Sequence, residues 1–253
     1  MPTPAQIAML EPTGRRGSRL RCVMLTDGDR ASVARRISAL IDHQATVDPA
    51  RHVWLPNGFA LPQEAKLGET AGFISHHLRE ALMKWWLMDR RCANLPNWDI
   101  VSGATIDGRE GLILVEAKAY DGEARTDGKS RGGNPNNDKH IRDAIALANA
   151  GLNGVVRGWN LTAESHYQLC NRFAWAWKLA SLKVPVVLVY LGFLNAKEMK
   201  DCGQPFVTRV DWQNALHSHC KGIVPEAAWK QQLEINGISM RALIGSTQLD
   251  YEP

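Results

Sequence analysis

The sequence has no apolar run close to the ~18 residues that a membrane-spanning helix needs. Residues 1–21 also lack the apolar stretch of a signal peptide, so we expect a cytoplasmic location and no membrane partner. The five cysteines are scattered and form no C-x-x-C pair, which is typical of reduced thiols and not of a disulfide scaffold. No G-x-x-x-x-G-K-[ST] loop is present, so any nucleotide-driven motor would be a separate chain.

A large excess of charge of one sign is also missing. The 30 Lys and Arg residues face 26 Asp and Glu residues, which leaves a net charge of +4. This mild positive charge permits a polyanionic partner without demanding one. With 253 residues and 45% hydrophobic content, the chain is neither disordered nor collagen-like, and it is long enough for one large domain with appendages.

The N-terminal part predicts an extension with little structure at its start. Residues 1–19 combine Arg with Gly, Pro and Ser and are typical of a mobile basic tail. A short helix is expected next, with Asp29 as its N-cap and Val33 and Ile37 at helical spacing. We therefore assign residues 1–60 to an N-terminal extension.

Residues 67–88 carry a helical pattern with two acidic candidates. Leu78 and Trp85 belong to its apolar stripe. At about 100° per residue, Glu69 and Glu80 fall on a common line beside that stripe. Spacing alone does not choose between them, so both remain candidates for a carboxylate that supports a catalytic site.

Residues 98–120 change to the pattern of a β-hairpin. Asp107 and Gly108 form the turn signal between two apolar segments, and the second segment is apolar until Glu116. Residues two apart in a strand project to the same face, so Glu116 and Lys118 lie together. Charges inside such a strand are costly unless they are paired or hold a metal.

The remaining pattern completes an α/β fold. A Gly- and Asn-rich loop, two helices and a buried strand are expected at 121–140, 138–150, 165–183 and 184–193, respectively. We expect a mixed central β-sheet flanked by helices. Residues 61–200 form its core, and residues 201–253 form a C-terminal extension packed on that core.

The candidate catalytic constellation is Asp99 with Glu116 and Lys118. If the hairpin strands pair antiparallel, Asp99 lies close to Glu116, and two such carboxylates repel unless a hard cation lies between them. We expect Mg²⁺, for which Mn²⁺ can substitute, to be held by these two carboxylates and the carbonyl of Ala117. Lys118 would orient the attacking water or stabilise the transition state.

The acidic-x-Lys string by itself is weak, because the chain contains three more copies. They are Glu64-Ala65-Lys66, Asp127-Gly128-Lys129 and Glu198-Met199-Lys200. Glu116 differs from these because it ends an apolar strand and has an aspartate on the preceding strand. The context therefore identifies the candidate site.

These elements resemble the PD-(D/E)XK, or restriction-endonuclease-like, nuclease superfamily. The resemblance covers W98-D99-I-V, L-I-L-V-E116-A-K118, the preceding helix with its glutamates, and the helix and strand that follow. It implies a restriction-endonuclease-like α-β-β-β-α-β core, divalent-metal catalysis, and DNA or RNA as substrate. It also implies that Gln168, on the later helix, lies near the metal.

A group of cations near the Gly- and Asn-rich loop is a candidate for nucleic-acid binding. Its members are Lys129, Arg131, Lys139 and Arg142. A flexible arm of this charge would add sequence-independent affinity for the phosphate backbone, although solvated Lys and Arg are ordinary in loops.

We therefore expect a Mg²⁺-dependent nuclease that acts on nucleic acid, with DNA and endonucleolytic cleavage favoured. A nuclease-fold module that binds nucleic acid without cleavage and a cytosolic interaction protein remain alternatives. A homodimer and a separate partner subunit are both compatible with the sequence.

Overall fold

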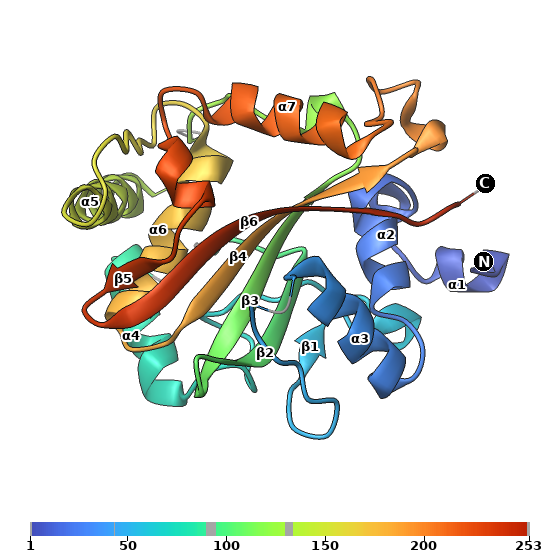
Figure 1. The fold of residues 1–253 in the computed structure, drawn as a ribbon, viewed down its shortest axis with the longest axis horizontal. Helices are drawn as coiled ribbons and strands as arrows, with labels where there is room; N and C mark the ends of the chain where they lie inside the picture. The colour runs from blue at the N-terminus through green and yellow to red at the C-terminus, as the bar shows by residue number, and fades with distance from the viewer. Residues whose placement is uncertain (1, 43, 90–94, 130–133, 252–253) are drawn as a thin grey trace.

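A six-stranded sheet lies between two layers of helices in the computed structural model, which describes residues 2–42, 44–89, 95–129 and 134–251 (Figure 1). The strands are β1 Trp54–Leu55, β2 Ile100–Ile106, β3 Arg109–Lys118, β4 Val186–Leu194, β5 Leu233–Ile235 and β6 Ile238–Gln248. The helices are α1 Pro4–Ala8, α2 Gly17–Leu25, α3 Arg30–Leu40, α4 His76–Trp86, α5 Pro135–Asn153, α6 Tyr167–Ser181 and α7 Arg209–Cys220. Short 3-10 turns are η1 Pro12–Gly14, η2 Gly58–Ala60, η3 Asp121–Glu123, η4 Lys197–Met199 and η5 Glu226–Trp229. In the described parts of the chain, no helix is both long and apolar enough to cross a membrane.

The sheet is mixed, in the order β1-β2-β3-β4-β6-β5. The pairs β1/β2, β2/β3 and β5/β6 are antiparallel, whereas β3/β4 and β4/β6 are parallel. The predicted hairpin is confirmed: Ile106 pairs with Arg109 across a two-residue turn. Asp107 and Gly108 have φ values of 50° and 75°, a left-handed backbone that Gly and Asp tolerate better than most residues.

Alternation along the central strands divides the core between the two faces of the sheet. Leu112 and Leu114 of β3 pack with α4, α5 and α6, while Ile113 and Val115 pack with α2 and α3. Because both faces are covered, β4 is buried from Val186 to Phe193. This two-sided burial explains the continuous apolar run in its sequence.

Residues 2–19, expected as a mobile basic tail, contain α1, η1 and the start of α2. Thr3 caps α1 in a capping box with Gln6, and α2 begins at Gly17 and packs against β3. Arg21 of α2 is fully buried and forms an ion pair with Glu198. Local composition predicted a solvated tail because it does not report these long-range partners.

The helix expected over residues 67–88 begins only at His76. The side chain of Ser75 accepts a hydrogen bond from the N–H of Leu78 and so caps α4. Gly72, with φ of 97°, lies outside the right-handed helical region. Glu69 therefore lies in a turn, and the common helical face expected for Glu69 and Glu80 does not exist.

Two further elements differ from the expectations. α5 starts earlier than predicted, at Pro135, because Asn134 caps it and proline suits the first turn of a helix. The resemblance implied three strands between two helices, but the described residues between α4 and α5 form only β2 and β3. β1, which precedes α4 in the chain, occupies the sheet position beside β2.

The C-terminal residues contribute directly to the central sheet. β6 lies between β4 and β5, and it runs parallel to β4 over its register from Met240 to Gln248. Segments far apart in sequence therefore surround the end of β3, where the charged residues of the predicted constellation lie (Figure 1).

Candidate active site

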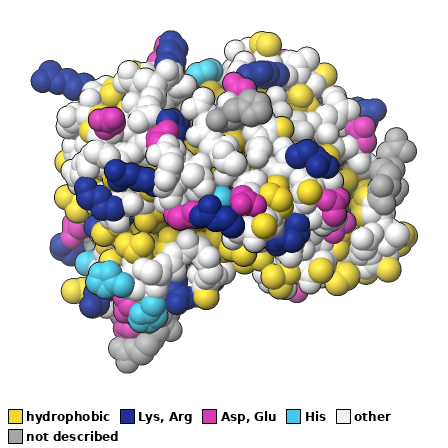
Figure 2. All heavy atoms as spheres, turned by 60° about the horizontal axis from the view of Figure 1, so that its bottom comes forward, with side chains coloured by type: hydrophobic (Ala, Val, Ile, Leu, Met, Phe, Trp, Pro, Cys, Tyr) yellow, Lys and Arg dark blue, Asp and Glu magenta, His cyan; other side chains and the backbone are white. Residues whose placement is uncertain are grey.

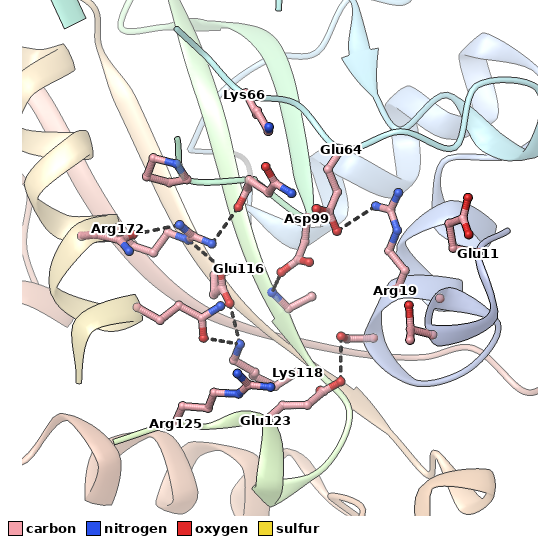
Figure 3. Close-up of a pocket in the computed structure, with 18 of the residues that line it drawn as sticks. Glu11, Arg19, Glu64, Lys66, Asp99, Glu116, Lys118, Glu123, Arg125 and Arg172 are labelled. Carbon is pink, nitrogen blue, oxygen red and sulfur yellow. Dashed lines mark hydrogen bonds and ion pairs between the residues drawn. The ribbon is translucent and has the colours of Figure 1, made fainter. Parts of the chain in front are cut away.

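Asp99, Glu116 and Lys118 meet where β2 begins and β3 ends. The antiparallel register of these strands brings Asp99, the residue before β2, next to Glu116. The backbone N–H of Ala117 donates a hydrogen bond to Oδ2 of Asp99 over 2.7 Å (Figure 3). The proximity predicted from the hairpin is therefore present in the fold.

Glu116 is held between two cations. Its Oε1 accepts a hydrogen bond from Nζ of Lys118 and its Oε2 accepts one from Nε of Arg172, each over 2.5 Å. Its side chain is only 1% exposed. Burial alone would raise the pKa of Glu116, but the charges and hydrogen bonds of Arg172 and Lys118 outweigh it and lower that pKa.

Helix α6 positions both cations. Gln168 accepts a hydrogen bond from Nζ of Lys118 over 2.9 Å, as its predicted place near the site requires. One turn later, Arg172 also donates to the carbonyl of Asn97 over 2.7 Å, and its guanidinium lies 4.7 Å from the ring centroid of Trp98. Helical spacing from Gln168 is the only sequence signal that could have identified Arg172.

Asp99 has the opposite electrostatic environment. It keeps some accessible surface toward solvent, but protein atoms surround it closely. Burial, followed by repulsion from Glu116, raises the pKa of Asp99 to about 8, although Lys118 acts in the opposite direction. This carboxyl group is therefore protonated at neutral pH unless a further positive charge stabilises its ionised form.

A third carboxylate, Glu64, approaches the site and was missed from the sequence. Ala65 pairs with Trp98 in an isolated antiparallel bridge, which sets Glu64 beside Asp99. Glu64 contributes to the raised pKa of Asp99, and it forms a 3.0 Å ion pair with Arg19 of α2 (Figure 3). The acidic-x-Lys string at Glu64 was visible in the sequence, but a Pro-rich loop gave no sign that it lies next to Asp99.

These residues face one cleft of about 1260 Å³. Its walls come from five stretches of the chain, within 9–19, 62–66, 95–99, 116–128 and 167–172. The first stretch belongs to the segment that composition had assigned to a mobile tail. The cleft therefore depends on the N-terminal helices as much as on the sheet.

Neither of the two glutamates expected from the helical pattern lines this cleft. Glu69 lies in the turn before α4, with its carboxylate 3.9 Å from Nζ of Lys66. Glu80 lies within α4, away from the lining residues. The expectation depended on one continuous helix, and the start of α4 at His76 removes its basis.

The described cations of the predicted nucleic-acid arm are not among the residues that line the cleft. Lys129 and Arg142 both form ion pairs with Asp138, and Arg142 also contacts Glu164. Lys139 forms an ion pair with Asp143 on the exposed surface of α5. Arg131 lies outside the described residues. These partners neutralise much of the positive charge that the sequence pattern indicated.

The donor set at the cleft floor suits a hard divalent cation. Asp99 and the buried Glu116 are adjacent carboxylates, and burial followed by repulsion from Glu116 raises the pKa of Asp99, so a nearby positive charge favours ionisation of both. Over the described residues, no three His, Cys, Asp or Glu side chains are already gathered as a metal cage. Glu116 is instead occupied by Lys118 and Arg172, so cation binding would require its carboxylate to change partners.

Comparison of this chain with protein-family models, with curated proteins and with solved structures found no match.

Proposed function

We propose that this chain is a divalent-metal-dependent nuclease that hydrolyses phosphodiester bonds of nucleic acid, with DNA as the expected substrate. One observation carries the proposal: the partly buried carboxylate of Asp99, the buried carboxylate of Glu116 and Lys118 converge at the floor of an open cleft. They come from adjacent strands, as in the restriction-endonuclease-like enzymes that the sequence resembles. The acidic-x-Lys string, which occurs four times in the chain, does not by itself predict that these side chains converge.

Asp99 and Glu116 would hold the Mg²⁺ ion, with the carbonyl of Ala117 as a further oxygen ligand. A bound Mg²⁺ lowers the pKa of a coordinated water and neutralises charge that develops on a phosphate oxygen. Glu64, beside Asp99, adds negative charge that favours a cation at this position. Arg172 holds the Glu116 carboxylate toward the cleft floor.

Lys118 is the residue that we expect to position the attacking water. In the metal-free fold its Nζ is held by Glu116 and by Gln168, and the contact with Gln168 does not involve the carboxylate that would bind the metal. An ammonium group here donates to the water or to a phosphate oxygen, and it stabilises negative charge as the phosphodiester is attacked. Gln168 keeps that ammonium aligned without adding charge of its own.

A cleavage assay tests the proposal directly. Supercoiled plasmid, linear duplex and single strands would be incubated with the protein in Mg²⁺, Mn²⁺ or EDTA. Cleavage should require metal and should be lost in Asp99→Ala, Glu116→Gln and Lys118→Ala. Glu110→Gln is the matched control, because Glu110 lies on β3 at the opposite end and is exposed.

Full cleavage by the Glu116→Gln protein would overturn the proposal. A nucleic-acid-binding module without cleavage is the second candidate, because both oxygens of Glu116 are already occupied by cations in the fold. Salt-sensitive binding with no cleavage under any metal condition would favour that module.

A further inference from the structure

The floor of the cleft is recessed beneath its rim. Glu116 and Lys118 are 1% and 8% exposed, respectively, and Arg172 beside them is 5% exposed. The segment around η1 lines one side of the cleft, and the stretch that follows η3 lines the other. A phosphodiester must therefore enter the cleft to reach these side chains.

Cations lie at two depths of the cleft, among carboxylates. At the floor, Lys118 and Arg172 flank Glu116, and these three groups together carry one net positive charge beside Asp99. At the rim, Arg125 is exposed and, within the described parts of the chain, it forms no ion pair. Of the other cations that line the outer part of the cleft, Arg19 is paired with Glu64 over 3.0 Å and Lys66 lies 3.9 Å from Glu69. Arg125 is thus the exposed cleft cation that is available to a phosphate without loss of an ion pair.

Two tyrosines add apolar ring surface to the same cleft. Tyr120 follows β3 and Tyr167 begins α6, and both are only partly buried. Aromatic rings beside an available cation suit single-stranded nucleic acid, because bases stack on the rings whatever their sequence while the cation binds a phosphate. A base pair inside a duplex does not offer its face in this way.

The size and surroundings of the cleft argue against a duplex at its floor. A cleft of 1260 Å³ has room for a few nucleotides. A duplex is a stiff rod with a persistence length of about 50 nm, so bending it locally toward a recessed floor costs free energy that a flexible single strand does not spend. Figure 2 shows one face of the molecule, on which the Lys and Arg side chains are interspersed with Asp and Glu side chains, so this face offers no broad basic track.

We infer that the cleft takes a single-stranded segment of nucleic acid, with Arg125 binding a backbone phosphate at the rim. The inference depends on the proposed function for its choice of site, and it deepens that function by naming the form of the substrate. A free strand, a frayed end or a locally unpaired region would qualify, since each offers flexible phosphates and unstacked bases.

Binding, measured without cleavage, tests this inference separately from the nuclease activity. Fluorescence anisotropy would be recorded in EDTA with labelled DNA and RNA single strands and with a blunt DNA duplex of equal length. The single strands should bind at least about tenfold more tightly than the duplex. Arg125→Ala should weaken single-strand binding about tenfold, as loss of one charge-assisted contact implies. It should also reduce the slope of log affinity against log salt by about 0.7.

Two control variants define the outcome. Arg109→Ala removes an exposed arginine at the far end of β3, and Lys230→Ala removes an exposed lysine that follows η5. Both should retain wild-type binding. Equal or tighter binding of the duplex, or equal losses in all three variants, would overturn the inference. Tight single-strand binding without cleavage in Mg²⁺ would instead refute the nuclease and leave the inference standing.

Discussion

Asp99→Asn should change stability and metal binding in opposite directions. In the metal-free fold, burial and Glu116 raise the pKa of Asp99 from 3.8 to about 8. A difference of one pH unit corresponds to about 1.4 kcal/mol, so holding the proton at pH 7 costs about 4 kcal/mol in a rigid site. Relaxation of the surroundings lowers this figure, and we expect the variant to be more stable by about 2–4 kcal/mol in EDTA. The asparagine oxygen can still accept from the N–H of Ala117.

The sign of this effect depends on pH in a defined way. Because the folded pKa of Asp99 lies above the unfolded one, the folded state binds more protons between about pH 4 and pH 8. The wild-type protein therefore loses stability from this group as the pH rises through that window. The advantage of Asp99→Asn should be largest near pH 8 and should vanish toward pH 4.

Divalent cations should reverse the comparison. A ligand at one hundred times its dissociation constant stabilises the folded state by about 2.7 kcal/mol. Ca²⁺, used as a probe, should therefore raise the free energy of unfolding of the wild-type protein and leave Asp99→Asn unchanged. Urea denaturation followed by tryptophan fluorescence measures both, since Trp98 is buried beside the site.

Asp143→Asn is the matched control, because Asp143 is an exposed carboxylate on α5. It should change the free energy of unfolding by less than about 0.5 kcal/mol and should keep the response to Ca²⁺. The reasoning is refuted if Asp99→Asn is less stable than wild type in EDTA at pH 8. It is equally refuted if Ca²⁺ stabilises the variant as much as the wild-type protein.

Three further predictions concern the same cleft. Arg172→Met should lower the free energy of unfolding by about 3–5 kcal/mol, because it leaves Glu116 buried with one partner. In a double-mutant cycle measured by urea denaturation, adding Glu116→Gln should recover most of that loss. Glu64→Gln should reduce the rate of metal-dependent cleavage about 10- to 100-fold, whereas Glu69→Gln, outside the cleft, should leave that rate unchanged. Burial, followed by His166 and Lys118, lowers the pKa of His219 to about 4, so stability from this group is present above pH 6.5 and is lost as the pH falls toward 4. When the pH falls from 7 to 5, the free energy of unfolding of His219→Gln, measured by urea denaturation, should therefore drop by about 1 kcal/mol less than that of the wild-type protein. This difference is small because the His219 ring is partly exposed.

The local patterns of the chain were sufficient for the elements that local rules govern. The Asp107-Gly108 turn, the apolar run of β4 and the N-cap at Asp29 were all predicted and are confirmed. The proximity of Asp99 and Glu116 followed from the same rules, because a two-residue turn sets the register of a hairpin and therefore which residues face each other.

The first residue of α4 could not be predicted from the sequence pattern. The apolar spacing from Leu67 onward continues through residues that form turns, and the cap at Ser75 decides the start of α4. Hydrophobic periodicity is insensitive to such a boundary, since core-facing turns also bury apolar residues. Because of this error, Glu69 or Glu80 was expected beside the central carboxylates, whereas Glu64 lies there.

Only the tertiary structure decided which distant residues complete the cleft. Arg19, Glu64, Arg125 and Arg172 come from four separate stretches, and no pattern within any one stretch reports that they share a cleft. The pKa of Asp99 and the ion pairs of Glu116 likewise depend on burial and on partners far along the chain. The sequence by itself thus determined the two strands that carry the central carboxylates. Long-range packing determined their charge state, their partners and the cleft through which a substrate reaches them.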